Sequence, residues 1–147
     1  MYTREESSAI KQEFWTIFGK YMSPIPSSEG TRVNWVNYRT GVKDVYFRME
    51  TLNDSASISI SIEHTDLGIR ELFFEQFKEL KIMLEEALGE EWNWVNNSST
   101  TRITKTLPGA SVFNKDQWPV LISFFKPRLI ALDSFWENAK WSFEELK

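Results

Sequence analysis

Cysteine is absent from this chain of 147 residues, and histidine occurs only once, as His64. The lack of cysteine excludes disulfides, zinc sites made of thiolates and cysteine nucleophiles. A single histidine also excludes a metal site with several imidazole ligands. We therefore expect the chain to carry no cofactor and no metal site.

Long apolar runs are missing as well. No stretch approaches the about 18 consecutive apolar residues that a transmembrane helix needs. The first residues, MYTREESSAIKQEF, are polar and charged and lack the apolar run of a signal peptide. These features predict a cytoplasmic protein that is not associated with a membrane.

An excess of basic charge is also lacking, because the formal net charge is −4. This balance argues against a protein that coats duplex nucleic acid through bulk charge, but it allows a local basic patch. Aromatic residues, in contrast, make up 15% of the chain. Each of them buries a large area, so the core or a binding surface should be rich in aromatic rings. The length predicts one domain, residues 1–147, that can bury a core of its own.

The stretch 66–89 shows the clearest helical periodicity in the chain. Its apolar residues recur every three or four positions and form one stripe: Ile69, Phe73, Phe77, Leu80, Leu84 and Leu88. Glutamate and lysine residues fill the opposite side. This pattern predicts an amphipathic helix of about six turns, which packs its stripe on the apolar face of a sheet.

Two further helices are expected near the ends of the chain. Thr3 and Glu6 have the spacing of a capping box, and apolar residues at helical spacing follow them, so the sequence predicts a helix over 4–22. A last helix should begin near Asp116 and continue towards the C-terminus. Pro127 lies inside it, and we expect this proline to kink or split the helix.

Alternating patterns predict the strands, and the cleanest of them is the serine-isoleucine run ASISISIEH. Three consecutive strands are expected to form a meander, and two later ones a hairpin: 32–39, 43–52, 56–64, 91–97 and 101–107. The predicted fold class is α+β, with an antiparallel sheet, helices packed on one face and the order α-β-β-β-α-β-β-α.

Basic and aromatic residues alternate along the first two predicted strands. They form the candidate binding site, which consists of Tyr38, Arg39, Lys43, Tyr46 and Arg48. Aromatic rings interleaved with arginines on a sheet can stack bases and hold phosphates. The expected partner is single-stranded nucleic acid or another protein, and the competing interpretation is an ordinary solvated sheet face.

A divergent nuclease is the main enzymatic alternative. Restriction-type nucleases need an acidic residue on one strand and an acidic-x-Lys triplet on the next, to bind magnesium and activate water. Asp44 and Glu63 have the right strand context, but Thr65 stands where the lysine is required. His64 could act as a general base, yet no serine lies in a nucleophile elbow. The sequence therefore favours a protein without catalytic activity.

Tryptophans near the second hairpin suggest a third function. Trp92 and Trp94 fall on one face of a predicted strand, where they could line a small-ligand pocket between sheet and helices. Packing in the core is the competing interpretation, because both follow core periodicity.

Several segments carry a family resemblance. They are the serine-isoleucine strand, FWTIF at 14–18, LEEALGEEWNW at 84–94, ITKTL at 103–107 and DQWPVLISFF at 116–125. Over nearly its whole length the chain resembles the uncharacterised bacterial family known as domain of unknown function 4268, and we expect it to be that domain alone. In longer relatives this domain follows a nuclease-like domain. The resemblance implies an accessory or interaction domain linked to nucleic-acid metabolism or defence against foreign DNA, and it supplies no catalytic residues.

Overall fold

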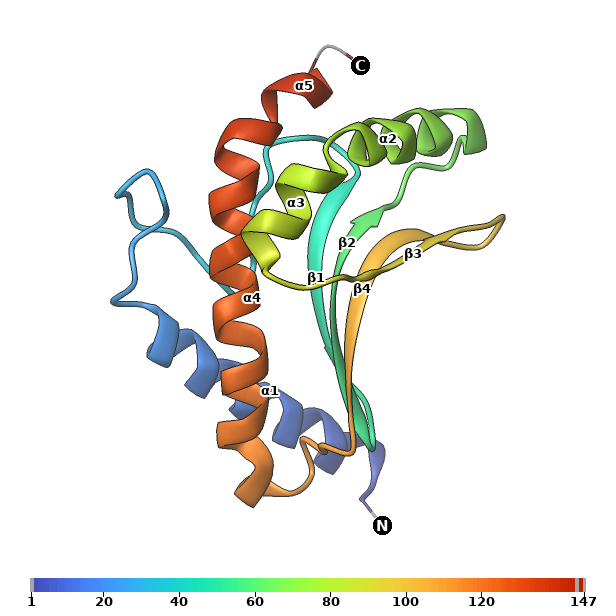
Figure 1. The fold of residues 1–147 in the computed structure, drawn as a ribbon. Helices are drawn as coiled ribbons and strands as arrows, with labels where there is room; N and C mark the ends of the chain where they lie inside the picture. Colours follow the sequence, from blue (N-terminus) through green and yellow to red (C-terminus); the bar gives the residue numbers. More distant parts are fainter. Residues whose placement is uncertain (1, 145, 147) are drawn as a thin grey trace.

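A computed structural model of the chain, describing residues 2–144 and 146, contains a four-stranded antiparallel sheet with helices on one of its faces (Figure 1). In chain order the elements are α1 (Arg4–Met22), β1 (Val45–Thr51), β2 (Ser55–Ile62), α2 (Leu67–Glu79), α3 (Lys81–Leu88), β3 (Asn93–Asn96), β4 (Thr101–Pro108), the 3-10 helix η1 (Lys115–Gln117), α4 (Trp118–Ala139) and α5 (Trp141–Glu144). The predicted α+β class is thereby confirmed. None of the described helices is both long and apolar enough to cross a membrane.

Two antiparallel hairpins, β1–β2 and β3–β4, meet along β2 and β4, which gives the strand order β1-β2-β4-β3. The isoleucines of β2 are buried, and Ile60 lies opposite Phe47 of β1 and Ile103 of β4. Ser59 points to the other side of the sheet, between Arg48 and Thr104. One face of the sheet is thus the floor of the core, and the other is a polar surface, called the outer face below.

The strand predicted at 32–39 does not form, because these residues belong to a long loop between α1 and β1. Trp35 is buried, and its Nε1 donates a hydrogen bond to the Ile25 carbonyl oxygen at 2.9 Å. The Asn37 N–H donates to Asn34 Oδ1 at 3.1 Å and closes a turn. A strand would need backbone hydrogen bonds to a neighbouring strand. Here, hydrogen bonds from and to these side chains hold the backbone in a loop instead. The expected three-stranded meander is therefore a two-stranded hairpin.

The helix predicted over 66–89 is divided at Leu80 into α2 and α3. Leu80 leaves helical geometry, with φ −99° and ψ 10°, and its N–H bonds to the carbonyl oxygen of Phe77, three residues earlier. Gly89 ends α3 with a positive φ of 69°, as expected for a glycine stop. Figure 1 shows the two helices running in different directions. The break lets Phe77 and Leu84, from the two halves of the predicted stripe, both become fully buried.

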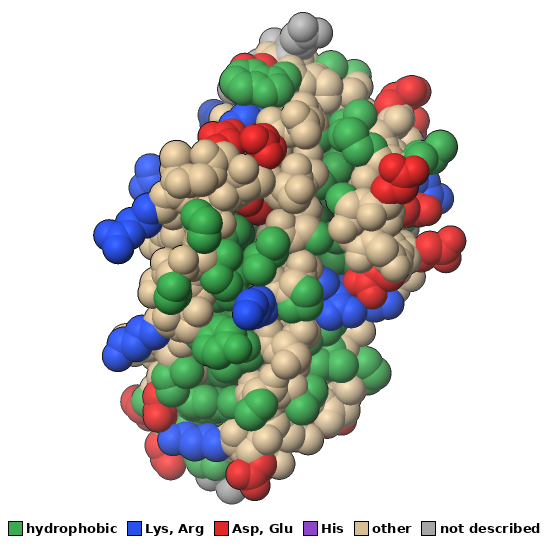
Figure 2. Space-filling view, turned by 60° about the vertical axis from the view of Figure 1, so that its left-hand side comes forward, with side chains coloured by type: hydrophobic (Ala, Val, Ile, Leu, Met, Phe, Trp, Pro, Cys, Tyr) green, Lys and Arg blue, Asp and Glu red, His purple; other side chains and the backbone are tan. Residues whose placement is uncertain are grey.

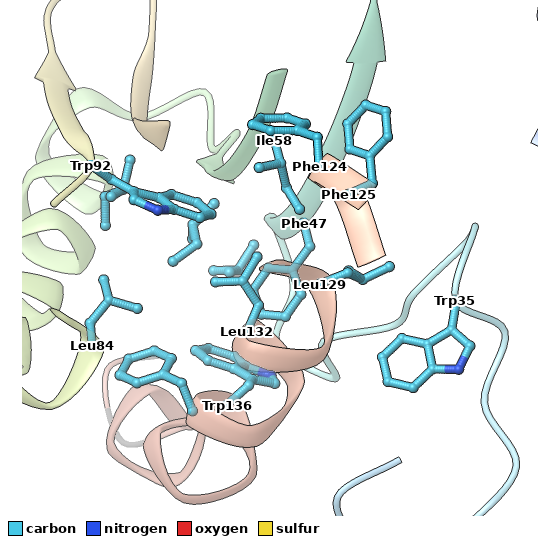
Figure 3. Close-up of a cluster of buried hydrophobic side chains, with 14 of the residues drawn as sticks. Trp35, Phe47, Ile58, Leu84, Trp92, Phe124, Phe125, Leu129, Leu132 and Trp136 are labelled. Carbon is cyan, nitrogen blue, oxygen red and sulfur yellow. The ribbon is translucent and has the colours of Figure 1, made fainter. Parts of the chain in front are cut away.

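The core lies between the sheet and α4, whose inner side chains are Leu121, Phe125, Leu129, Leu132 and Trp136. In Figure 3, Leu132 and Trp136 lie between Leu84 of α3 and Phe47 of β1. The helix α4 is uninterrupted although Pro127 lies inside it, so the expected split is wrong. Pro127 sits on the exposed side of α4, where water can bind the carbonyl group that loses its hydrogen bond.

A charged cluster fastens the turn after α3 to α4. The Glu90 carboxylate accepts hydrogen bonds from Arg128 Nε at 2.8 Å, from Arg128 Nη2 at 3.0 Å and from Trp92 Nε1 at 2.9 Å, and Lys105 Nζ lies 3.9 Å away. Burial alone would raise the pKa of Glu90, but the hydrogen bonds from Arg128 and Trp92 and the two positive charges outweigh it and lower that pKa. The ionised carboxylate is therefore the form that stabilises the fold.

Replacing Glu90 by glutamine should make the free energy of unfolding fall by about 1–3 kcal/mol at neutral pH, because Arg128 loses its charged acceptor. A lowered carboxyl pKa contributes stability above the unfolded-state pKa, and this contribution is lost as the pH falls through the folded-state pKa. The difference from the wild type should thus become smaller as the pH falls. Urea titrations at pH 7 and at about pH 3 measure it, with the exposed Glu86→Gln as control. An equal loss at both pH values would contradict the assignment.

Candidate functional site

The structure separates the five residues of the predicted binding site into three places. Tyr38 and Arg39 lie in the loop between α1 and β1, beside the C-terminal half of α4. Lys43 is exposed in the turn before β1, and Tyr46 and Arg48 lie on the outer face of β1. A continuous basic-aromatic strip is therefore not formed.

On the outer face, Tyr46 and Arg48 already interact with each other. The Arg48 guanidinium lies 4.1 Å from the centre of the Tyr46 ring and donates two hydrogen bonds to Glu63, at 2.9 and 2.7 Å. These hydrogen bonds raise the pKa of Arg48 and lower that of Glu63. A phosphate at Arg48 would have to compete with Glu63 for the guanidinium.

Tyr38 fastens the loop to α4. Its hydroxyl donates to Asp133 Oδ1 at 2.5 Å, and the Ser28 N–H donates to Asp133 Oδ2 at 2.7 Å. Its ring stacks against those of Trp35 and Phe47. Burial, together with the hydrogen bond to Asp133 and the charge of that carboxylate, raises the pKa of Tyr38 far above its usual value. Tyr38 therefore holds the loop in place through its hydroxyl and through the contacts of its ring.

An open groove of about 620 Å³ lies on the loop side and is lined by Arg32, Val33, Asn34, Asn37 and Arg39. We call it the arginine groove. A second cavity of about 150 Å³ adjoins it and shares Arg32 and Arg39 with the surroundings of Asp133. Figure 2 brings this side of the molecule forward and shows Lys and Arg side chains among hydrophobic and uncharged groups.

Both arginines of the groove are exposed. Among residues 2–144 and 146, neither guanidinium has a hydrogen-bond or ion-pair partner. Three acids line the adjoining cavity: Glu29 accepts a hydrogen bond from Lys140 at 3.3 Å, Asp133 binds Tyr38, and Glu137 lies within ion-pair distance of neither arginine. Two guanidinium groups are therefore available to an anion at one place on the surface.

Sequence reasoning missed Asp133, which holds this loop. The chain does contain a signal, because Asp133 lies four residues after Leu129 and three before Trp136, within the apolar stripe of the last helix. Asp133 is only 5% exposed. A buried carboxylate needs hydrogen-bond donors, so its position in the stripe could have indicated a polar partner from another segment.

The groups considered for catalysis are only partly brought together. Asp44 and His64 line one cavity, whereas the Glu63 carboxylate pairs with Arg48. His64 Nδ1 accepts the Asp66 N–H at 2.9 Å, just before α2. In the described part of the chain, no group of three or more histidine, aspartate or glutamate side chains could hold a metal ion.

The two tryptophans considered for a ligand pocket contact neighbouring side chains. Trp92 is buried and donates its Nε1 hydrogen bond to Glu90 at 2.9 Å. Trp94 meets the edge of Phe74, with 5.7 Å between the ring centres. These contacts place both rings in the packing around α2, α3 and the second hairpin.

Comparison with known proteins gives one match. The profile of a family described as a domain of unknown function, DUF4268, matches residues 10–140, from within α1 to the end of α4. No curated protein and no solved structure matches the chain. Because the match covers residues 10–140 of the 147, including the whole sheet and helices α2, α3 and α4, the chain belongs to the DUF4268 family.

Proposed function

We propose that residues 1–147 act as one non-enzymatic interaction domain and that the arginine groove binds single-stranded nucleic acid. The observation that carries the proposal is the pair of exposed guanidinium groups, Arg32 and Arg39, which have no acidic partner among the described residues and line the same open groove. The family resemblance suggests the setting, an accessory role in nucleic-acid metabolism or in defence against foreign DNA.

The chemistry of the groove suits a flexible phosphate backbone. Guanidinium groups bind phosphate oxygens in pairs of hydrogen bonds, and the amides of Asn34 and Asn37 can donate to or accept from base edges. A duplex is a poorer ligand, because the net charge of −4 opposes binding over a long, highly charged surface. Two phosphate contacts with a single strand should give a modest affinity. The logarithm of the binding constant should fall with the logarithm of the salt concentration with a slope of about −1.4.

The remaining residues of the sequence-based site have different places in this proposal. Tyr38 acts indirectly, because it fixes the loop that carries Arg32 and Arg39. Lys43, Tyr46 and Arg48 stay predicted contacts and do not line the groove. Base stacking is assigned to Tyr46, which is 37% exposed.

The double substitution Arg32→Ala/Arg39→Ala should lower the affinity for a labelled single strand by about tenfold for each arginine removed. Fluorescence anisotropy at low and moderate salt measures this, and the variant should also lose most of the salt dependence. The matched control is Arg4→Ala/Lys78→Ala, which removes the same charge from α1 and α2 and should bind like the wild type.

Three outcomes would decide against the proposal. An equal loss in the control would show that only overall charge matters. Absence of binding at tens of micromolar protein would leave a protein partner as the interaction. Cleavage of the strand on addition of magnesium, abolished by Asp44→Ala, would support the nuclease alternative.

A further inference from the structure

Another cavity, which shares no lining residue with the arginine groove, lies where the turn before β1 meets the start of α2. It measures about 300 Å³ and is lined by Lys43, Asp44, His64, Ile69, Phe73 and Leu146. Its wall is mostly apolar. This volume is at the lower end of the range found for small-molecule sites, which runs from about 300 to 1,000 Å³.

The polar residues of this cavity are held in place by the backbone. The Glu63 N–H donates to the carbonyl oxygen of Asp44 at 2.7 Å, which joins the turn before β1 to the end of β2. Asp44 has a positive φ of 67°, a conformation that aspartate and asparagine adopt more readily than most residues. His64 Nδ1 is already an acceptor for the Asp66 N–H, so a neutral His64 carries its proton on Nε2 and can donate from there.

Lys43 and Asp44, which follow each other in the chain and carry opposite charges, both line this mostly apolar cavity. Among the residues that the structure describes, neither the Lys43 ammonium nor the Asp44 carboxylate has a hydrogen-bond or ion-pair partner. An ammonium and a carboxylate at the same apolar cavity match a small molecule that carries both charges next to an apolar group. The Lys43 ammonium and His64 Nε2–H would bind the carboxylate of that molecule, and Asp44 would bind its ammonium.

We infer that this cavity binds a free α-amino acid with a large apolar side chain. The side chain would occupy the wall formed by Ile69, Phe73 and Leu146, and the charged end would remain at Lys43 and Asp44. This site is separate from the arginine groove, because the two share no lining residue.

The test uses isothermal titration calorimetry of the full chain with L-leucine and three relatives. Glycine lacks the side chain and should bind about 10- to 100-fold more weakly, because it loses the free energy gained by burying one leucine side chain. Two further compounds, 4-methylpentanoate and 3-methylbutylamine, keep the apolar group but lack the ammonium and the carboxylate, respectively. Each should bind at least about tenfold more weakly than leucine, because one charged hydrogen-bonding group stays without its partner.

Two variants that each remove one charge test the roles of Asp44 and Lys43. Asp44→Asn should weaken leucine binding at least about tenfold and leave 4-methylpentanoate binding unchanged, since that compound has no ammonium. Lys43→Gln should weaken leucine and 4-methylpentanoate alike and leave 3-methylbutylamine unchanged. Asparagine tolerates a positive φ and Lys43 is exposed, so both variants should melt like the wild type.

Asp116→Asn, a change of the same kind at an exposed residue on η1, is the control and should bind leucine normally. No heat of binding at millimolar leucine in the wild type would overturn the inference. Equal affinities for leucine, glycine and the two singly charged compounds would overturn it as well.

Discussion

Phe77→Ala is expected to lower the free energy of unfolding by about 3–5 kcal/mol, the range for truncating a large aromatic side chain in a core. Phe77 is fully buried on α2. Its ring centre lies 4.4 Å from that of Phe143 on α5 and 6.1 Å from that of Trp136 on α4. Three helices therefore meet at this ring, and their side chains cannot close the cavity without moving α2 relative to α4.

Chemical unfolding by urea measures the effect, and Leu72→Ala on the same helix is the matched control. Leu72 is 44% exposed, so its truncation should change stability by no more than about 0.5 kcal/mol. Similar small losses in both variants would mean that α2 does not pack through Phe77. A lower urea dependence of the Phe77→Ala variant, with the midpoint unchanged, would indicate an altered denatured state instead of a lost contact.

Tyr38→Phe should cost about 1.5–3 kcal/mol at neutral pH, because the buried Asp133 carboxylate loses a hydrogen bond and keeps only the one from Ser28. The ring, with its contacts to Trp35 and Phe47, remains. The substitution therefore removes a single interaction, the one that ties the loop between α1 and β1 to α4.

The same residue gives the protein a pH dependence in alkali. The pKa of Tyr38 is raised in the folded state, so the neutral phenol stabilises the fold. Its contribution is fully present below the unfolded-state tyrosine pKa of about 10 and is lost as the pH rises from there towards the folded-state pKa. Wild-type stability should thus fall steeply above about pH 10, and more steeply than that of Tyr38→Phe.

Thermal melts from pH 7 to 11 compare the two proteins, with Tyr21→Phe as control. Tyr21 is 53% exposed, and its replacement should leave the alkaline slope unchanged. Parallel pH profiles for the wild type and Tyr38→Phe would show that the Tyr38–Asp133 hydrogen bond contributes nothing to the stability of the folded state.

In addition, Tyr38→Phe should weaken nucleic-acid binding by loosening the loop that holds Arg32 and Arg39.

Local patterns were enough to predict the elements whose stabilisation is local. Helix α1 begins after Thr3 because the Thr3–Glu6 capping box forms as predicted and satisfies backbone groups at its first turn. Strand β2 follows the strict alternation of isoleucine and serine, since one face of the sheet is covered and the other is not. The β3–β4 hairpin forms around the predicted turn, where Asn97 accepts hydrogen bonds from the N–H groups of Ser99 and Thr100.

Contacts between distant segments decided the rest. The alternation at 33–36 resembles a strand, but the bond from Trp35 to Ile25 and the anchoring of Tyr38 on Asp133 favour a loop. Tyr38 and Asp133 are 95 residues apart in the chain, so no local sequence pattern could predict their hydrogen bond. Likewise, the periodicity of 66–89 is continuous, and only the positions of the core side chains around it divide the helix at Leu80. The candidate sites depend on such contacts: a sequence shows which residues can bind an anion, and the packing of loops on α4 and α2 determines which of them share a cavity.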